Sequence, residues 1–256
     1  MKNYFYLLLF AVLLTLQSCS VSTEATFYKD KTSTSIVELD AAQMLSMMSS
    51  FATDEDGKNP TFDDMKKLPS EFTSMYDIRK SEGNVSSNPD SVRILKKIFL
   101  KKLGSANEIT GTAFKFEKFT KQDIAMADHL LNGNKQSLPI DKFLFTDWDG
   151  KKLVLNTSNF SEDLVKELLN ANLDSAESSE NNYSQNEQMK MMIQMLGMKA
   201  NFNLKFEGKI KSITGKHDFV SKVDDKTISI TLDVNKLLED NPTWGNADKE
   251  IIIITE

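Results

Sequence analysis

An apolar segment near the N-terminus is the feature that most constrains this chain. Residues 4–16 are almost wholly apolar and follow one basic residue, Lys2. The segment is too short for a helix that crosses a bilayer, which needs roughly 20 residues, and its length is typical of a secretory signal peptide. Polar residues follow at once, and Cys19 is the only cysteine in the chain. No disulfide is therefore available within the chain, and packing must stabilise its folded part.

The end of the apolar segment, Leu16-Gln17-Ser18-Cys19, resembles the lipobox of bacterial lipoproteins: an aliphatic, a variable and a small residue, then cysteine. Gln17 departs from this pattern, because a small residue is usual there. The resemblance implies that the Cys19 thiol receives a diacylglyceryl group, that residues 1–18 are removed as a signal peptide, and that the new amino group is acylated. Two or three acyl chains make a stable membrane anchor. An ordinary secretory peptide and an uncleaved membrane helix are the alternatives.

The residue after Cys19 indicates where the anchored protein is sorted. An aspartate at this position is the inner-membrane retention signal of such lipoproteins, and this chain has Ser20. The resemblance therefore implies the outer membrane. Glu24 is the only acidic residue between 20 and 24, so the acidic run of surface-exported lipoproteins is missing. We expect a protein of the cell envelope that is anchored in the outer membrane and faces the periplasm.

Length and charge restrict the partners. Removal of residues 1–18 leaves 238 of the 256 residues, enough for one substantial core or two small ones. The formal net charge is −6, and it becomes −7 when Lys2 is removed. A negative protein is a poor general binder of nucleic acid or anionic headgroups. We expect the membrane as a partner through the lipid on Cys19, and no nucleic acid.

Hydrophobic periodicity predicts short helices and strands that alternate along the chain. Helices are expected at about 41–52, 61–78, 90–103, 121–131, from 161, 189–196 and 234–238. Extended segments are expected at about 24–40, 108–119, 143–148, 152–156, 200–206, 210–213, 220–223, 227–233 and 251–254. Asp149-Gly150 lies between two apolar runs and predicts a type I′ hairpin turn. The last segment is fully apolar, which indicates a strand at the centre of a sheet.

These elements predict an α+β fold, with a mostly antiparallel twisted sheet and helices packed on one face. We expect a lipidated tether over residues 19–24 and a single domain over 25–256, with a flexible polar loop near 170–188. Residues 200–256, which include Phe206-Glu-Gly-Lys-Ile210 and Gly215, resemble the domain of mycobacterial LppM-type lipoproteins. The general layout resembles lipoproteins of Bacteroidetes-type bacteria.

Four methionines form the sharpest candidate site. Met189, Met192, Met195 and Met198 are spaced by three, so on a helix they share one face. Such a face favours packing, because methionine fills irregular gaps. It could also line a groove for an apolar ligand, and thioethers can bind Cu(I). We favour packing, keep the four methionines as ligand-groove candidates, and expect no metal.

No set of residues predicts catalysis. His129 and His217 are 88 positions apart, and each is followed or preceded by an aspartate but by no nucleophile. No phosphate loop, nucleophile elbow or zinc-protease motif occurs. The chain is therefore expected to bind an envelope protein or an apolar ligand, without a cofactor or catalytic residue. An enzyme with a site of dispersed carboxylates and a purely structural envelope protein are the alternatives.

Overall fold

Two β-sheets and four short α-helices form the part of the chain that the structure describes. The structure is a computed structural model, and it describes residues 20–40, 42, 65–84, 86–105, 108–132, 147–160, 191, 194, 197–239 and 242–256. Cys19 and the methionines Met189, Met192 and Met195 lie outside these residues. The predicted flexible loop at 170–188 also lies outside them.

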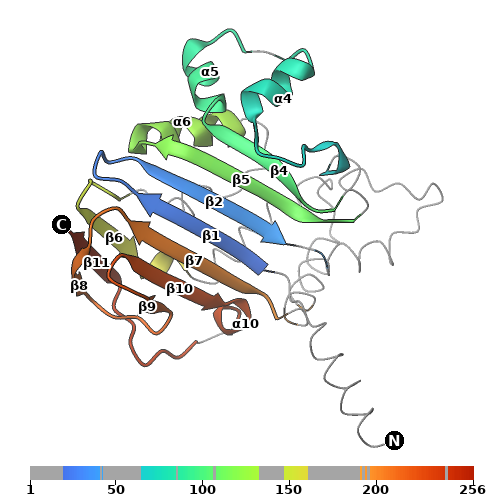
Figure 1. Cartoon of the computed structure of the whole chain (residues 1–256). Coiled ribbons are helices and arrows are strands. Elements are labelled where there is room, and N and C mark those ends of the chain that lie inside the picture. The colour runs from blue at the N-terminus through green and yellow to red at the C-terminus, as the bar shows by residue number, and fades with distance from the viewer. Residues whose placement is uncertain are drawn as a thin grey trace, which may run out of the picture.

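The larger sheet has eight strands in the order β3-β4-β5-β2-β1-β7-β10-β9 (Figure 1). The strands are β1 (Ser20–Phe27), β2 (Ser33–Asp40), β3 (Thr73–Ser74), β4 (Ile98–Gly104), β5 (Ile109–Phe119), β7 (Lys199–Phe206), β9 (Val220–Lys222) and β10 (Thr227–Asp233). Neighbouring strands are antiparallel except β1 and β7, which are parallel. Because parallel neighbours need a crossover, the chain between β1 and β7 makes this connection.

Alternation along the central strands gives the larger sheet two different faces. One face, which we call the covered face, is mainly apolar. Its members include Thr23, Ala25, Phe27, Ser33, Ser35, Val37, Phe202, Leu204, Phe206, Ile228, Ile230 and Leu232, all of them buried. The other face, the open face, has mostly polar side chains between these positions, with Ile36 among them.

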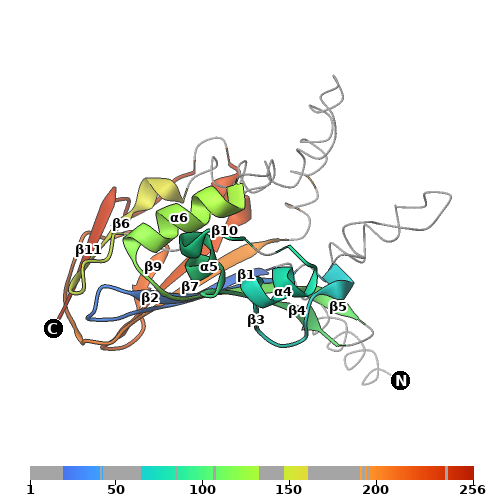
Figure 2. The same cartoon turned by 90° about the horizontal axis from the view of Figure 1, so that it is seen from above.

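The smaller sheet has the order β6-β11-β8 and lies on the covered side of the larger sheet (Figure 2). Its strands are β6 (Lys152–Asn156), β8 (Ile210–Thr214) and β11 (Glu250–Thr255). β11 is the central strand, as the fully apolar segment predicted. Ile251 and Ile253 of β11 and Leu153 and Leu155 of β6 are buried. They join the same hydrophobic cluster as Phe202 of the larger sheet.

The described α-helices are short and have polar caps. They are α4 (Met75–Ser81), α5 (Pro89–Leu95), α6 (Lys121–Asn132) and α10 (Val234–Leu237), and a 3-10 turn, η1, covers Thr157–Asn159. Ser74, Asn88 and Asp233 accept backbone N–H groups at the starts of α4, α5 and α10. Helix α6 lies over the covered face (Figure 2) and buries Ile124 and Ala127. Among the described residues, no helix is long and apolar enough to cross a membrane.

The α+β class and the mostly antiparallel sheet are confirmed, but two helices differ from the prediction. Within the segment 61–78, residues Thr73–Ser74 form strand β3 and helix α4 begins only at Met75. The helix predicted over 90–103 is shorter. Helix α5 ends at Leu95, and the expected continuation to 103 is strand β4. Residues 98–104 pair with β5, and in that pairing Ile98 and Leu100 share a face with Phe116 and Phe114. Pairing with a neighbouring strand here overrides the helical spacing that the sequence suggests.

One turn and the N-terminal tether also differ from expectation. Trp148 and Leu153 form a β-bridge around Asp149 and Gly150, so the hairpin is present. Only the glycine has a positive φ, of 100°, whereas a type I′ turn needs two such residues. The expected tether over 19–24 is replaced from Ser20 onward by strand β1.

Candidate functional site

The covered face contains two polar groups that lack partners. Thr23 and Ser35 are 0% and 1% exposed. Among the described residues, neither the Thr23 Oγ1 nor the Ser35 Oγ has a hydrogen-bond partner. The register pairs Thr23 with Val37 and Ala25 with Ser35. The two hydroxyls are therefore diagonal neighbours on one face, with Cα atoms about 7–8 Å apart.

The surroundings of these hydroxyls are apolar. On the neighbouring strands, Phe202 lies opposite Thr23 and Phe116 lies opposite Ser35. Both aromatic side chains are buried. A buried hydroxyl without a partner costs about 1–3 kcal/mol, so two adjacent ones mark a place where a hydrogen-bonding group of a ligand or a water would be accepted.

The open face presents hydroxyl and amide groups over several strands. Its members on β1, β2, β7 and β10 include Ser20, Ser22, Thr26, Thr34, Asn201, Asn203, Ser229 and Thr231, all at least partly exposed. Glu24 and Lys205 add an ion pair of 2.8 Å. In Figures 1 and 2 the helices α6 and α10 and the smaller sheet lie on the opposite side. Of the described elements, none covers the middle of this face.

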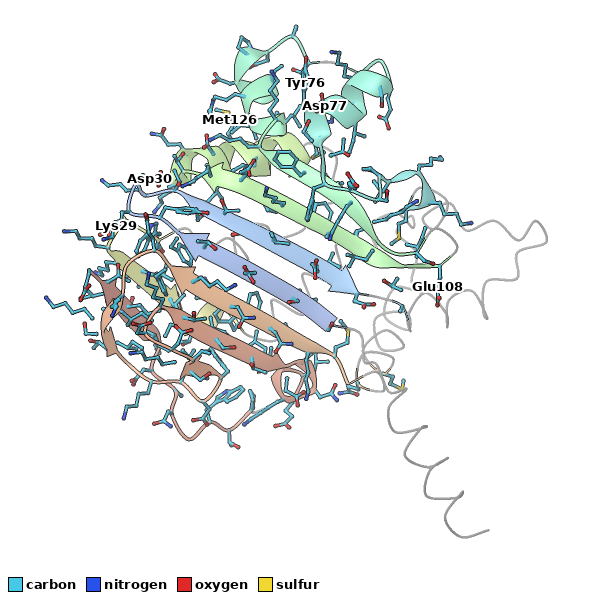
Figure 3. All side chains as sticks on the ribbon, in the orientation of Figure 1. Lys29, Asp30, Tyr76, Asp77, Glu108 and Met126 are labelled. Carbon is cyan, nitrogen blue, oxygen red and sulfur yellow. The ribbon has the colours of Figure 1, made fainter. Side chains whose placement is uncertain are left out.

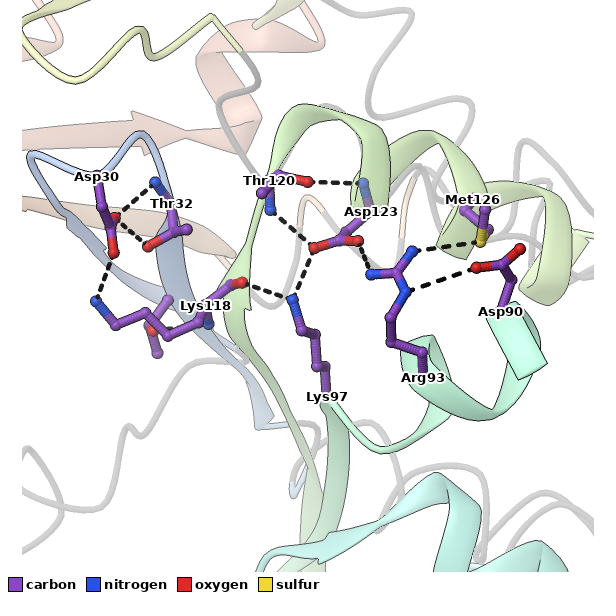
Figure 4. A network of polar contacts seen from close by, with 10 residues as sticks. Asp30, Thr32, Asp90, Arg93, Lys97, Lys118, Thr120, Asp123 and Met126 are labelled. Carbon is purple, nitrogen blue, oxygen red and sulfur yellow. Dashed lines mark hydrogen bonds and ion pairs between the residues drawn. The ribbon is translucent and has the colours of Figure 1, made fainter.

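Asp123 is a buried carboxylate at the centre of a network of polar contacts (Figure 4). It is 2% exposed and accepts from Arg93, from Lys97 Nζ at 2.8 Å and from the Thr120 N–H at 3.1 Å. Burial raises the pKa of Asp123, but hydrogen bonds from Lys97 and Arg93 outweigh it and lower the pKa to about 2. Because Thr120 Oγ1 also accepts from the Asp123 N–H, the pair caps α6. The network joins α6 to the segment 93–97.

His217 is buried in an aromatic cluster. Its ring stacks on Phe219 with centroids 3.7 Å apart and lies 5.0 Å from Trp244. Lys236 Nζ lies 4.0 Å above the Trp244 ring. Burial lowers the pKa of His217, while Asp218 and Asp248 oppose this change. The Asp218 carboxylate is turned to Gly245 and Asn246, so the His–Asp neighbours do not form a catalytic pair.

Of the four methionines and two histidines that the sequence singled out, the structure describes the side chains of Met198 and His217. Met198 is half-buried against the hydrophobic cluster, and its carbonyl accepts from the Val234 N–H at 3.1 Å. This one member of the methionine set therefore packs on the core. Met191, beside the set, is 55% exposed. The side chain of His129 lies outside the described residues. No group of three or more potential metal ligands occurs within the described part of the chain.

Sequence reading missed Thr23 and Ser35. Both belong to a segment whose alternation was visible, but hydroxyl residues are common on either face of a strand. Only the register of β1, β2 and β7 shows that they lie on the covered face. Asp123 had a recognisable signal, because Thr120 and Asp123 have the spacing of a capping box.

Comparison with known proteins gives one weak structural similarity. No protein-family model matches the chain, and no curated protein matches it significantly. The folded domain of the LppM protein of Mycobacterium tuberculosis, solved by NMR, is similar with a TM-score of 0.35 and 11% sequence identity. The match covers 93% of this chain and 91% of that chain. The resemblance expected from residues 200–256 thus corresponds to a weak structural similarity, and no functional argument rests on it.

Proposed function

We propose that the protein is a lipid-anchored protein of the cell envelope, attached through Cys19, and that its domain binds an apolar ligand rather than catalysing a reaction. The lipobox Leu16-Gln17-Ser18-Cys19 supports the anchor. The observation that carries the ligand proposal is the pair of buried hydroxyls, Thr23 and Ser35, which have no partner among the described residues. A ligand that is mostly apolar and has one hydrogen-bonding group suits a face of this composition.

The acid–base groups of the described residues favour binding over catalysis. Asp123 is neutralised by Lys97 and Arg93 and its pKa of about 2 is far from the range of a general acid or base at neutral pH. His217 is buried among aromatic rings, and the carboxylate of the neighbouring Asp218 accepts from Gly245 and Asn246.

Replacement of the cysteine tests the anchor. We expect wild-type protein to partition into the detergent phase of a membrane extract, with acyl chains on the N-terminal cysteine in intact mass spectra. Cys19→Ala should remain in the aqueous phase, because it loses the thiol that receives the diacylglyceryl group. Ser18→Ala is the matched control, since it keeps a small residue before the thiol. An unmodified Cys19 in membrane-purified protein would refute the anchor.

Replacement of the hydroxyls tests the ligand. Protein purified from membranes in mild detergent is extracted with organic solvent, and the extract is compared by mass spectrometry with the known acyl anchor. We expect an additional apolar compound at close to one per protein, and a several-fold loss of it in Thr23→Val with Ser35→Ala. Thr26→Val, on the open face, should leave the amount unchanged. Wild-type protein without any such compound contradicts ligand binding and leaves the anchor unaffected.

A further inference from the structure

The first residue of β1 determines where an anchor on Cys19 meets the domain. Ser20 already belongs to the larger sheet, where it pairs with Asp40 of β2 and with Lys199 of β7. Cys19 is its direct neighbour in the chain, and consecutive Cα atoms are about 3.8 Å apart. No flexible linker can therefore separate a lipid on Cys19 from this sheet.

Several strands begin or end at the same end of the sheet as Ser20, and we call this end the anchor edge. It comprises Ser20, Asp40, Leu103, Glu108, Lys199 and Asp233. Strands are about 4.8 Å apart, so Asp40 and Lys199 lie about 5 Å from Ser20. Asp233 ends β10, about 10 Å from Ser20 by the same spacing. Glu108 precedes β5 and lies three residues beyond Gly111, the β5 residue that pairs with Asp40.

The opposite end of the sheet is the turn between β1 and β2. Figure 3 shows Lys29 and Asp30 of this turn at one end and Glu108 at the other. β1 has eight residues, and at about 3.3 Å per residue they separate the two ends by roughly 23 Å. A lipid at the anchor edge is therefore far from Lys29 along the strand direction.

We propose that the anchor edge faces the lipid headgroups and that the strands of the larger sheet stand along the membrane normal. This inference rests on the proposed lipidation of Cys19. Ser20 is the first residue of β1 and Cys19 precedes it directly in the sequence, so acyl chains on Cys19 would enter the bilayer at the anchor edge. The anchor edge carries charges of both signs, including Asp40, Lys199 and Asp233, and thus needs no anionic lipid.

The alternative is a domain that lies flat on the membrane. The covered face cannot make this contact, because α6 and the smaller sheet lie over it. The open face could make it only by placing the Glu24–Lys205 and Glu38–Lys101 pairs against the headgroups. In the upright orientation both pairs stay in water, and the open face points sideways.

Single-cysteine labelling measures the orientation. A lipidated Cys19 has no free thiol, and the chain contains no other cysteine, so an introduced cysteine is the only labelling site. The substitutions are Lys199→Cys and Glu108→Cys at the anchor edge, Ser229→Cys on the open face, and Lys29→Cys in the far turn. Each full-length lipidated variant carries a fluorescent label and is reconstituted into phosphatidylcholine vesicles that contain a headgroup nitroxide lipid.

We expect quenching to be several-fold stronger at 199 and 108 than at 29, with an intermediate value at 229. Equal quenching at all four positions in vesicle-bound protein would overturn the upright orientation and leave the anchor intact. A free thiol in the wild-type protein, titrated after unfolding, would show that Cys19 is not lipidated and would overturn both proposals. These outcomes therefore distinguish a wrong orientation from a wrong anchor.

Discussion

At the scale of single residues, two aspartates of similar sequence context have opposite environments. Asp123 is buried and binds Arg93 and Lys97, whereas the Asp218 side chain accepts backbone N–H groups of Gly245 and Asn246 in an exposed turn. Removing one member of a buried charge network leaves the others without compensation. An exposed turn carboxylate has water as a substitute for its partners. Asp123 should therefore matter more for stability.

We expect Asp123→Asn to lower the free energy of unfolding by about 1–3 kcal/mol, because it removes the charge that binds two partly exposed cations. Urea denaturation measures this change. The pKa of Asp123 is lowered from 3.8 to about 2, so its contribution is present above pH 4 and is lost as the pH falls toward 2. In the Asp123→Asn variant, stability measured as the pH falls should no longer show the decrease that comes from protonation of Asp123. Asp90→Asn, whose carboxylate is exposed and 3.7 Å from Arg93, is the control and should change little.

His217 should make the free energy of unfolding depend on pH as well, but in a higher pH range than Asp123. Burial lowers its pKa below 6.5, so the unfolded chain binds a proton more readily than the folded protein. The free energy of unfolding is therefore highest above the pKa that His217 has in the unfolded chain, where the ring is neutral in both states. It decreases as the pH falls below 6.5. We expect a slope of at most about 1.4 kcal/mol per pH unit, the value for one proton, in urea midpoints measured between pH 7.5 and 5. His217→Phe should flatten this slope, and an unchanged slope would assign the dependence to other groups.

At the scale of elements, strands β2 and β5 pair where the backbone of Leu39 lies very close to Gly111. A Cβ atom on Gly111 would lie 1.9 Å from the Leu39 carbonyl oxygen, a distance that no pair of atoms tolerates without a shift. The contact is with backbone rather than with a flexible side chain. Glycine at 111 therefore permits the close approach of two strands at the anchor edge.

We expect Gly111→Ala to lower the free energy of unfolding by more than about 2 kcal/mol, because the methyl group must displace the β2 backbone. Hydrogen exchange should show lost protection at the amides around Leu39 before the rest of β2 is affected. Thr110→Ala, one residue earlier and half-buried, is the matched control. Equal protection in Gly111→Ala and wild type would disprove the role of this approach.

At the scale of the whole molecule, one hydrophobic cluster joins the two sheets. Phe27 and Phe206 of the larger sheet contact Trp148, which precedes the smaller sheet, at ring-centroid distances of 5.4 and 5.6 Å. The Trp148 indole donates to the Tyr28 carbonyl oxygen at 2.7 Å. Neither sheet can lose this contact without exposing the inner face of the other.

The shared cluster predicts a single cooperative unfolding transition. We expect tryptophan fluorescence, followed in a Trp244→Phe variant to isolate Trp148, to coincide with far-ultraviolet circular dichroism during urea unfolding. Fluorescence reports the contact between the sheets, and circular dichroism reports the strands themselves. A fluorescence midpoint at lower urea would show instead that the smaller sheet separates first.

Residue patterns predicted the strands best where one face is buried. Alternation in 200–206 and 227–233 and the helix at 121–131 are confirmed by β7, β10 and α6. Residues 98–104 were misjudged because Ile98 and the lysines after it fit either a helix or an edge strand. Hydrogen bonding to β5 decides between the two, and it involves residues that the local pattern does not include.

The sequence by itself determined the α+β class, the buried final strand and the possible lipid site at Cys19, since each depends on residues that are adjacent or periodically spaced. Tertiary structure alone decided that β1 and β7 are parallel neighbours and that the smaller sheet packs on the larger. It also decided that Thr23 and Ser35 share one buried face and that Ser20 already belongs to the sheet. These facts depend on register and contact between segments far apart in the chain, and no local pattern encodes them.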